Sequence, residues 1–170
     1  YDVFGSGGET AVASSTRGGT YEILGGFQAA EVGGSITLSM DKSNEIGLRQ
    51  ISSTAVNTTD LVLTVTTDSN SGYILSIISD GGFRTSSGNT IGPVSDGSVT
   101  AGQEEYGIST SGNDALLTGD NGIVGTVNIA SSAGAVTSQT TTVTFKVARK
   151  STTPSGDYQQ TVTFTATVNP

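Results

Sequence analysis

The sequence predicts an all-β fold: an antiparallel β-sandwich of the Ig-like or jelly-roll-like kind, preceded by an extended Gly-rich N-terminal arm. No stretch has sustained helical periodicity, and the 24 glycines and many β-branched residues disfavour helix. Short runs of alternating apolar and polar residues recur between turn residues, a pattern typical of sandwiches and barrels. A chain of 170 residues is long enough for one such domain to bury a stable core.

The clearest predicted strands lie near the C-terminus. Thr142–Arg149 and Thr161–Val168 both alternate apolar and polar residues, the period expected of a half-buried strand. Pro154 and Gly156 lie between them and mark a turn. We expect the two strands to be antiparallel and close in space, either as a direct hairpin or as a crossing between sheets.

Three earlier runs also predict strands. Ser35–Met40 and Asp60–Thr67 carry apolar residues at every second position, which predicts one buried face for each. Tyr73–Ser79 is apolar on both faces, which favours a central strand. Because the turn-rich segment Asp68–Gly72 separates the last two runs, we expect a hairpin in the middle of the sandwich.

The middle of the chain gives weaker signals. Glu104–Thr110 and Ile123–Ala130 are weaker strand candidates, and Gly81–Gly102 is so rich in Gly, Ser and Asp that we expect a long surface excursion. The large aromatic residues within the predicted strands are most simply core residues; they are Tyr73, Phe145 and Phe164.

The N-terminal segment divides the predicted domain organisation into an arm, residues 1–19, and a sandwich, residues 20–170. Thr20–Ala29 has period-2 apolar spacing, and its simplest interpretation is the first strand of its own sandwich. Residues 1–16 could instead cross to a neighbouring subunit and add a strand to an open sheet edge. The assembly interface would then include Val3, Phe4, Ala11, Val12 and Ala13.

Composition excludes several function classes. The net charge of −8 argues against binding nucleic acid or an anionic membrane surface. The chain has no histidine and no cysteine, which removes the common catalytic triads, thiolate metal sites and disulfides. We therefore expect no catalytic residues, no enzyme activity and no cofactor. No apolar run is long enough to span a membrane, and the chain begins at Tyr1, so we expect a processed, secreted form.

Three weaker candidate sites remain. Asp114, Asp120 and Asn121 lie in one predicted loop region and are candidate Ca²⁺ ligands, although they lack the spacing of a calcium-binding loop. Asn57 begins an Asn-Thr-Thr triplet and is a candidate glycosylation site. Glu104 and Glu105 are adjacent on a predicted strand, so their side chains point to opposite faces and do not form a catalytic pair.

Several segments resemble secreted Ig-like β-sandwich surface proteins of uncultivated, small-genome bacteria, over nearly the whole chain from about residue 14. The segments are Ser14–Gln28, Val65–Tyr73, Asp96–Gly107 and Thr153–Val162. The chain is more distantly similar to WxL-type cell-surface domains, but it lacks tryptophan and therefore their namesake motif. The resemblance implies an Ig-like sandwich and a surface location, and it implies no catalytic residue.

These observations lead to two expected functions. The first is a structural subunit of an extracellular filament or surface assembly, which forms a head-to-tail homopolymer by pilin-like addition of its N-terminal strand to the next copy. The second is a monomeric cell-surface adhesin or carbohydrate-binding module that binds glycans through the Gly81–Gly102 loop.

Overall fold

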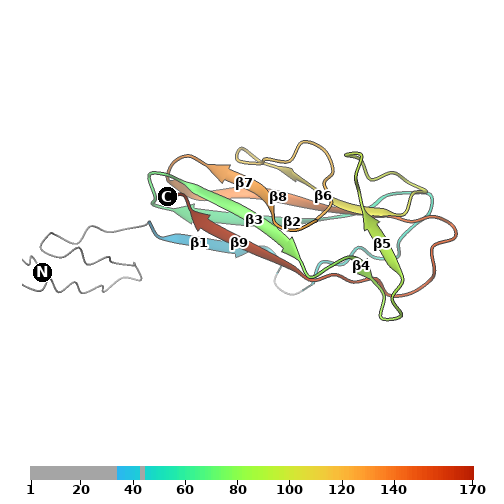
Figure 1. The fold of residues 1–170 in the computed structure, drawn as a ribbon. Coiled ribbons are helices and arrows are strands. Elements are labelled where there is room, and N and C mark those ends of the chain that lie inside the picture. The colour runs from blue at the N-terminus through green and yellow to red at the C-terminus, as the bar shows by residue number, and fades with distance from the viewer. Residues whose placement is uncertain (1–33, 43–44) are drawn as a thin grey trace, which may run out of the picture.

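The computed structural model describes residues 34–42 and 45–170 of the chain. These residues are all-β, as the sequence predicts, and form strands that face one another in two layers (Figure 1). The predicted arm and the Thr20–Ala29 run lie outside the described residues. The strands are β1 (Ile36–Met40), β2 (Asn57–Thr67), β3 (Tyr73–Ser79), β4 (Phe83–Arg84), β5 (Thr90–Pro93), β6 (Glu105–Ser111), β7 (Val127–Ser132), β8 (Val136–Ala148) and β9 (Val162–Val168).

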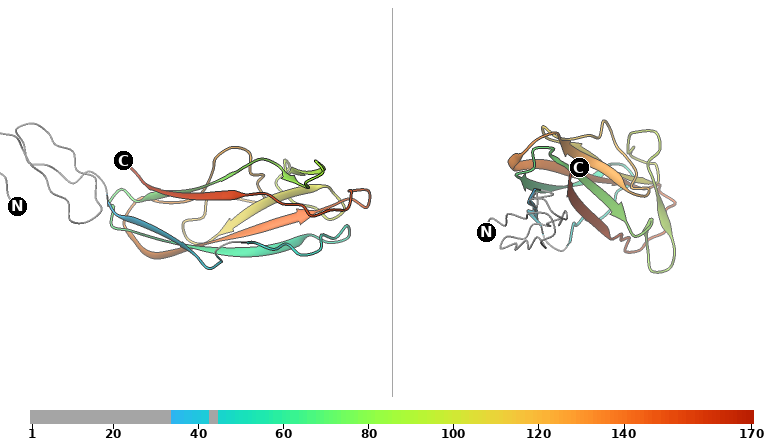
Figure 2. Two further views of the ribbon diagram at one scale, coloured as in Figure 1. Left: turned by 90° about the horizontal axis from the view of Figure 1, so that it is seen from below. Right: turned by 60° about the vertical axis from the view of Figure 1, so that its left-hand side comes forward.

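The two sheets differ in width. One has six strands in the order β1-β2-β8-β6-β5-β4, and the other has three in the order β7-β3-β9. Neighbouring strands are antiparallel, except that the short strand β5 runs parallel to β6. Figure 2 shows the same fold from two further directions. Because three strands face six, part of the wide sheet has no strand opposite it.

The core lies between the sheets and follows the predicted alternation. Leu61, Leu63 and Val65 of β2 are buried from one sheet, and Leu75 and Ile77 of β3 are buried from the other. Because successive side chains of a strand point to opposite faces, the residues between them lie on the outer surfaces. The prediction that Tyr73–Ser79 is a central strand is confirmed, since β3 pairs with both β7 and β9.

The predicted hairpin of Asp60–Ser79 is wrong. β2 pairs with β1 and β8, whereas β3 lies in the other sheet, so the turn after β2 crosses between the sheets. Gly72 in this turn has φ 80°, and a Cβ atom there would lie 2.0 Å from the carbonyl oxygen of Ser132. A glycine is therefore required where the chain bends sharply against a neighbouring backbone.

The two predicted C-terminal strands do not form a direct hairpin, and the chain crosses between the sheets there. β8 lies in the six-stranded sheet and β9 in the three-stranded sheet, so residues 149–161 carry the chain from one layer to the other. The predicted surface excursion at Gly81–Gly102 is also more structured than expected. It contains β4 and β5 and buries Ile91, Val94 and Val99.

Candidate functional site

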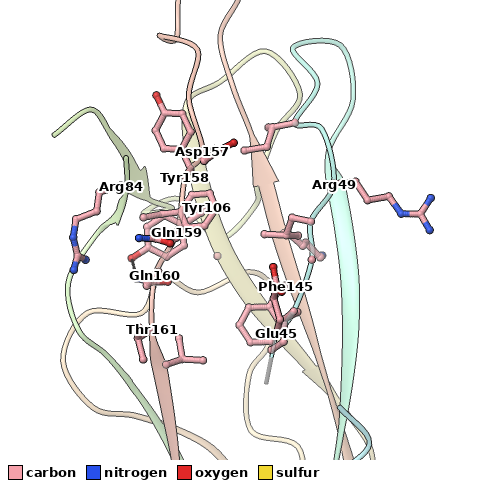
Figure 3. A pocket seen from close by; sticks show the side chains of 18 of the residues that line it. Glu45, Arg49, Arg84, Tyr106, Phe145, Asp157, Tyr158, Gln159, Gln160 and Thr161 are labelled. Atoms are coloured by element: carbon pink, nitrogen blue, oxygen red, sulfur yellow. Dashed lines mark hydrogen bonds between the residues drawn. The ribbon is translucent and has the colours of Figure 1, made fainter. Parts of the chain in front are cut away.

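The described residues form a groove along one side of the sandwich, where the edge strands β1 and β9 diverge. One wall is the first half of β9 with residues 153–161, and the other is the end of β1 with residues 45–51. The groove encloses about 1380 Å³ (Figure 3). Pockets for small molecules usually hold roughly 300–1,000 Å³, so this space suits a larger occupant such as a chain segment.

The groove exists because β9 is the last strand of the narrow sheet. Its inward side chains include Val162, Phe164 and Ala166, and all three remain partly exposed. Their opposite neighbours on β3 are better covered: Leu75 and Ile77, opposite Ala166 and Phe164, are fully buried. The interior of the sandwich is thus complete on the β3 side of β9 and open on the other side.

The backbone of β9 presents unused hydrogen-bonding groups to this opening. The Asp80 amide donates to the Thr161 carbonyl at 2.9 Å, and the Asn169 amide donates to the Gly72 carbonyl at 3.0 Å. Bonded and non-bonded residues alternate along an antiparallel pair, so Val162, Phe164 and Ala166 direct their N–H and C=O groups away from β3. No other described strand pairs with that edge.

The outer edge of β1 has the same character. The Asp41 amide donates to the Val62 carbonyl at 3.1 Å, so the alternation directs the backbone groups of Leu38 and Met40 away from β2. Met40 belongs to the inward row with Ile36 and Leu38, yet it is 46% exposed where it lines the groove. Two incomplete strand edges, one from each sheet, therefore border one opening.

The floor of the groove is apolar. Leu61 and Phe145 contribute from the middle of the wide sheet, and Ile46 and Leu48 contribute from the segment that follows β1. Phe145 projects into the opening in Figure 3 and is only partly buried. Side chains of this size gain free energy when a partner covers them, at about 25 cal/mol per Å² of apolar surface.

An aromatic cluster closes one end of the groove. The ring of Phe83 lies 5.9 Å from that of Tyr106 and 6.0 Å from that of Tyr158, measured between centroids. The Gln160 side-chain amide donates to the Tyr106 hydroxyl oxygen at 2.9 Å, and the Tyr158 hydroxyl donates to the Pro154 carbonyl at 3.0 Å. This end of the groove is therefore a fixed arrangement of rings and amides.

Charged side chains of both signs line the groove, and two of its cations are already paired, Arg84 with Asp80 and Lys146 with Asp120. Five of the chain's seven cations line the groove together with three acids, Glu45, Asp80 and Asp157; the cations are Lys42, Arg49, Arg84, Lys146 and Arg149. Arg84 pairs with Asp80 at 2.9 Å. The hydrogen bond from Arg84, followed by that from the Thr161 amide, holds the pKa of Asp80 below its ordinary value of 3.8.

The chain enters the described fold at the other end of the sandwich from the groove. The Ser35 amide donates to Asp68 at 2.6 Å, and the Thr67 hydroxyl donates to the Ser35 carbonyl at 2.7 Å. Gly34 is packed against Ser69 so closely that a Cβ atom would lie 2.7 Å from it. In Figure 1, β1 begins beside the end of β9, whereas the groove is lined by the opposite halves of these strands.

The candidate calcium ligands are not brought together. Asp114 accepts a hydrogen bond from the buried Tyr73 hydroxyl at 3.0 Å. Asp120 pairs with Lys146 at 2.6 Å and accepts the Val99 amide at 2.8 Å, while Asn121 joins the backbone of β6. Within residues 34–42 and 45–170, no group of three acidic, histidine or cysteine side chains could hold a metal ion.

The remaining predicted sites have local roles. The Asn57 side chain accepts a hydrogen bond from the Ser52 amide at 2.8 Å and donates one to the Gln50 carbonyl at 2.9 Å. Glycosylation of Asn57 stays a prediction. Glu104 accepts the Thr153 hydroxyl at 2.5 Å, and Glu105 accepts the Thr100 amide at 2.6 Å. Val3, Phe4, Ala11, Val12 and Ala13, the predicted assembly residues, lie outside the described part of the chain.

Sequence reasoning missed the groove itself. The sequence predicts Phe145 and Phe164 as core residues, and both pack against the core. It does not indicate that both side chains stay partly exposed. The alternation of Ile46 and Leu48 in a segment that is not a strand was the signal that could have drawn attention to the second wall.

Comparison with known proteins does not assign the fold or the groove. No family model matches the chain, and no curated protein or solved structure is detectably similar to it. None of the described residues forms a helix long and apolar enough to cross a membrane. The function must therefore be argued from the groove.

Proposed function

We propose that the protein is a structural subunit of an extracellular filament or surface assembly. In this proposal the domain is an Ig-like sandwich that lacks one strand, and the N-terminal segment of a neighbouring copy supplies it. The observation that carries the proposal is the apolar groove between two strand edges whose backbone groups have no described partner. An inserted strand would bond to such an edge and cover the apolar floor at once.

The positions of the groove and the chain entry support assembly in a line. The N-terminal segment leaves the sandwich at Gly34, at one end, and the groove opens toward the other end. A contact between two different surfaces of identical copies does not close by symmetry unless the rotation forms a ring, so it propagates head to tail. An uncovered edge of this kind is otherwise an aggregation hazard, which gives a reason for each copy to be capped by the next.

The test blocks the groove in the full chain. We expect the unmodified protein to form filaments in negative-stain micrographs, with a mass by light scattering that rises with concentration. Leu48→Arg places a charge in the groove and should leave single particles. Leu116→Arg is the matched control, because Leu116 is 46% exposed and does not line the groove, and it should still form filaments.

Circular dichroism should show the same β-rich spectrum for all three proteins. An unmodified protein that stays monomeric across the micromolar range contradicts the proposal. Filaments that persist in Leu48→Arg would show that the groove is not the contact.

A second candidate function is a surface adhesin or carbohydrate-binding module. The cluster of partly exposed rings of Phe83 and Tyr158, next to the side-chain amides of Gln159 and Gln160, is the observation that favours it. Sugars are bound by rings flanked by polar groups, and this cluster lies at the base of the 81–102 segment. Binding of the single-particle Leu48→Arg protein on a glycan array would support this function, and loss of that binding in Tyr158→Ala would locate it.

A further inference from the structure

We propose that the strand which fills the groove is Thr20–Ala29 of a second copy, rather than the first sixteen residues of the chain. This inference rests on the proposed function, because it names the occupant of the same groove. It is carried by the size of the groove, by the spacing of the apolar residues that remain outside the described structure, and by the length of chain between them and β1.

The groove requires large side chains. Its floor and walls expose parts of Leu48, Phe145, Val162 and Phe164 around about 1380 Å³. Glycine, alanine and serine make up half of residues 1–16, and Ala11 and Ala13 form the apolar row of their best strand. Such small residues would leave most of the opening unfilled, and unfilled space forfeits the contacts that favour packing.

Thr20–Ala29 has the complementary pattern. Tyr21, Ile23 and Phe27 fall on one face of a strand, so all three can point at the apolar floor while Glu22 points outward. The edge of β9 spans seven residues, about 23 Å, and the ten residues of this segment are sufficient to cover it and to continue past Thr161.

The connection also fits transfer between copies. Six peptide units separate Ala29, the last residue of the segment, from Ser35. Ala29 can therefore lie at most about 20 Å from the point where Asp68 and Thr67 hold Ser35. In the proposed head-to-tail arrangement, this length lets the segment enter the end of the next copy that lies beside Gly34.

The test uses two full-length variants with substitutions in different stretches. Tyr21→Ser/Ile23→Ser/Phe27→Ser should abolish filaments, whereas Val3→Ser/Phe4→Ser/Val12→Ser should retain them. A labelled synthetic peptide of Thr20–Ala29 should bind the first variant, whose groove is unfilled. Its affinity should fall by roughly 30-fold or more when Leu48→Arg is added to that variant. A peptide of residues 1–16 should bind neither protein.

Equimolar mixing then distinguishes transfer between copies from self-filling. The Leu48→Arg protein has an intact Thr20–Ala29 segment and a blocked groove. The Tyr21/Ile23/Phe27 variant has an altered segment and an open groove. Light scattering of the mixture should show a 1:1 complex. Two separate monomers would overturn exchange between copies, and filament loss confined to the Val3/Phe4/Val12 variant would overturn the choice of segment while leaving the filament proposal intact. An unmodified protein that never polymerises would instead remove the proposed function.

Discussion

Ile77 of β3 and Phe164 of β9 lie directly opposite each other, yet Ile77 is fully buried and Phe164 is partly exposed. The two residues belong to one sheet and face one interior. They differ because Ile77 has a strand on each side, whereas Phe164 has one side open to the groove. The fully buried part of the core therefore ends between Ile77 and Phe164.

This difference in burial predicts unequal effects on stability in the isolated subunit. In the Leu48→Arg background, Ile77→Ala should lower the free energy of unfolding by about 2–5 kcal/mol, because it leaves a cavity in a closed core. Phe164→Ala should cost less, about 1–2 kcal/mol, because much of the ring is not removed from water. Urea unfolding measures both values. An equal or larger cost at Phe164 would mean that the groove is already filled in the single subunit.

Tyr73 predicts a loss of stability at alkaline pH. Burial, and then the hydrogen bond to Asp114, raise the pKa of Tyr73 well above its ordinary value of 10.0. Its contribution is fully present below pH 10 and declines above it, because the unfolded chain then releases a proton that the folded chain retains. The free energy of unfolding should fall by up to about 1.4 kcal/mol per pH unit on this account.

Tyr73→Phe removes the ionisable group and keeps the ring. Urea unfolding between pH 9 and 11 should therefore give a shallower decline for Tyr73→Phe than for the unmodified protein, in which the remaining tyrosines supply a common background. Parallel curves would contradict the assignment. At pH 7 the variant should lose about 1 kcal/mol, the usual net contribution of a hydrogen bond.

Asp120 and Lys146 predict an asymmetric response to substitution. Asp120 is 8% exposed and accepts hydrogen bonds from both the Lys146 ammonium and the Val99 amide, whereas the Lys146 side chain is 26% exposed. Asp120→Ala leaves two donors without a partner and should cost about 3 kcal/mol. Lys146→Met keeps the length of the side chain and should cost about 1–2 kcal/mol. Thermal unfolding of both variants and the double variant measures the coupling, and equal single costs would contradict the asymmetry.

The sequence was sufficient to predict most of the longer strands, but not the short strands β4 and β5 and not which strands pair. Leu61, Leu63 and Val65 recur at every second position, and that period indicates which face is buried. It does not report which strand lies beside β2, because a turn such as Asp68–Gly72 serves a hairpin and a crossing equally well. The crossing is decided by long-range packing, in which Gly72 must lie against the backbone at Ser132.

The groove could not be predicted for a related reason. It joins residues from β1, the 45–51 segment, β8 and β9, which are brought together only after both crossings are made. Val162 and Phe164 alternate with threonines just as the buried Leu63 and Val65 of β2 do, so this alternation does not indicate that β9 lacks a neighbour. The N-terminal sequence led us to expect an open strand edge somewhere on the sandwich. Only the fold shows which strands border it.

The attachment of Ser35 to the turn after β2 has a mechanical consequence. Asn169, at the end of β9, is bound to the same turn through Gly72 and Ser71, so both ends of the described chain share one anchor. In a fibre under tension, the pull would enter at Ser35 along the axis of β1. The five residue pairs that join β1 to β2 would then resist in shear, all at once, rather than being peeled apart singly.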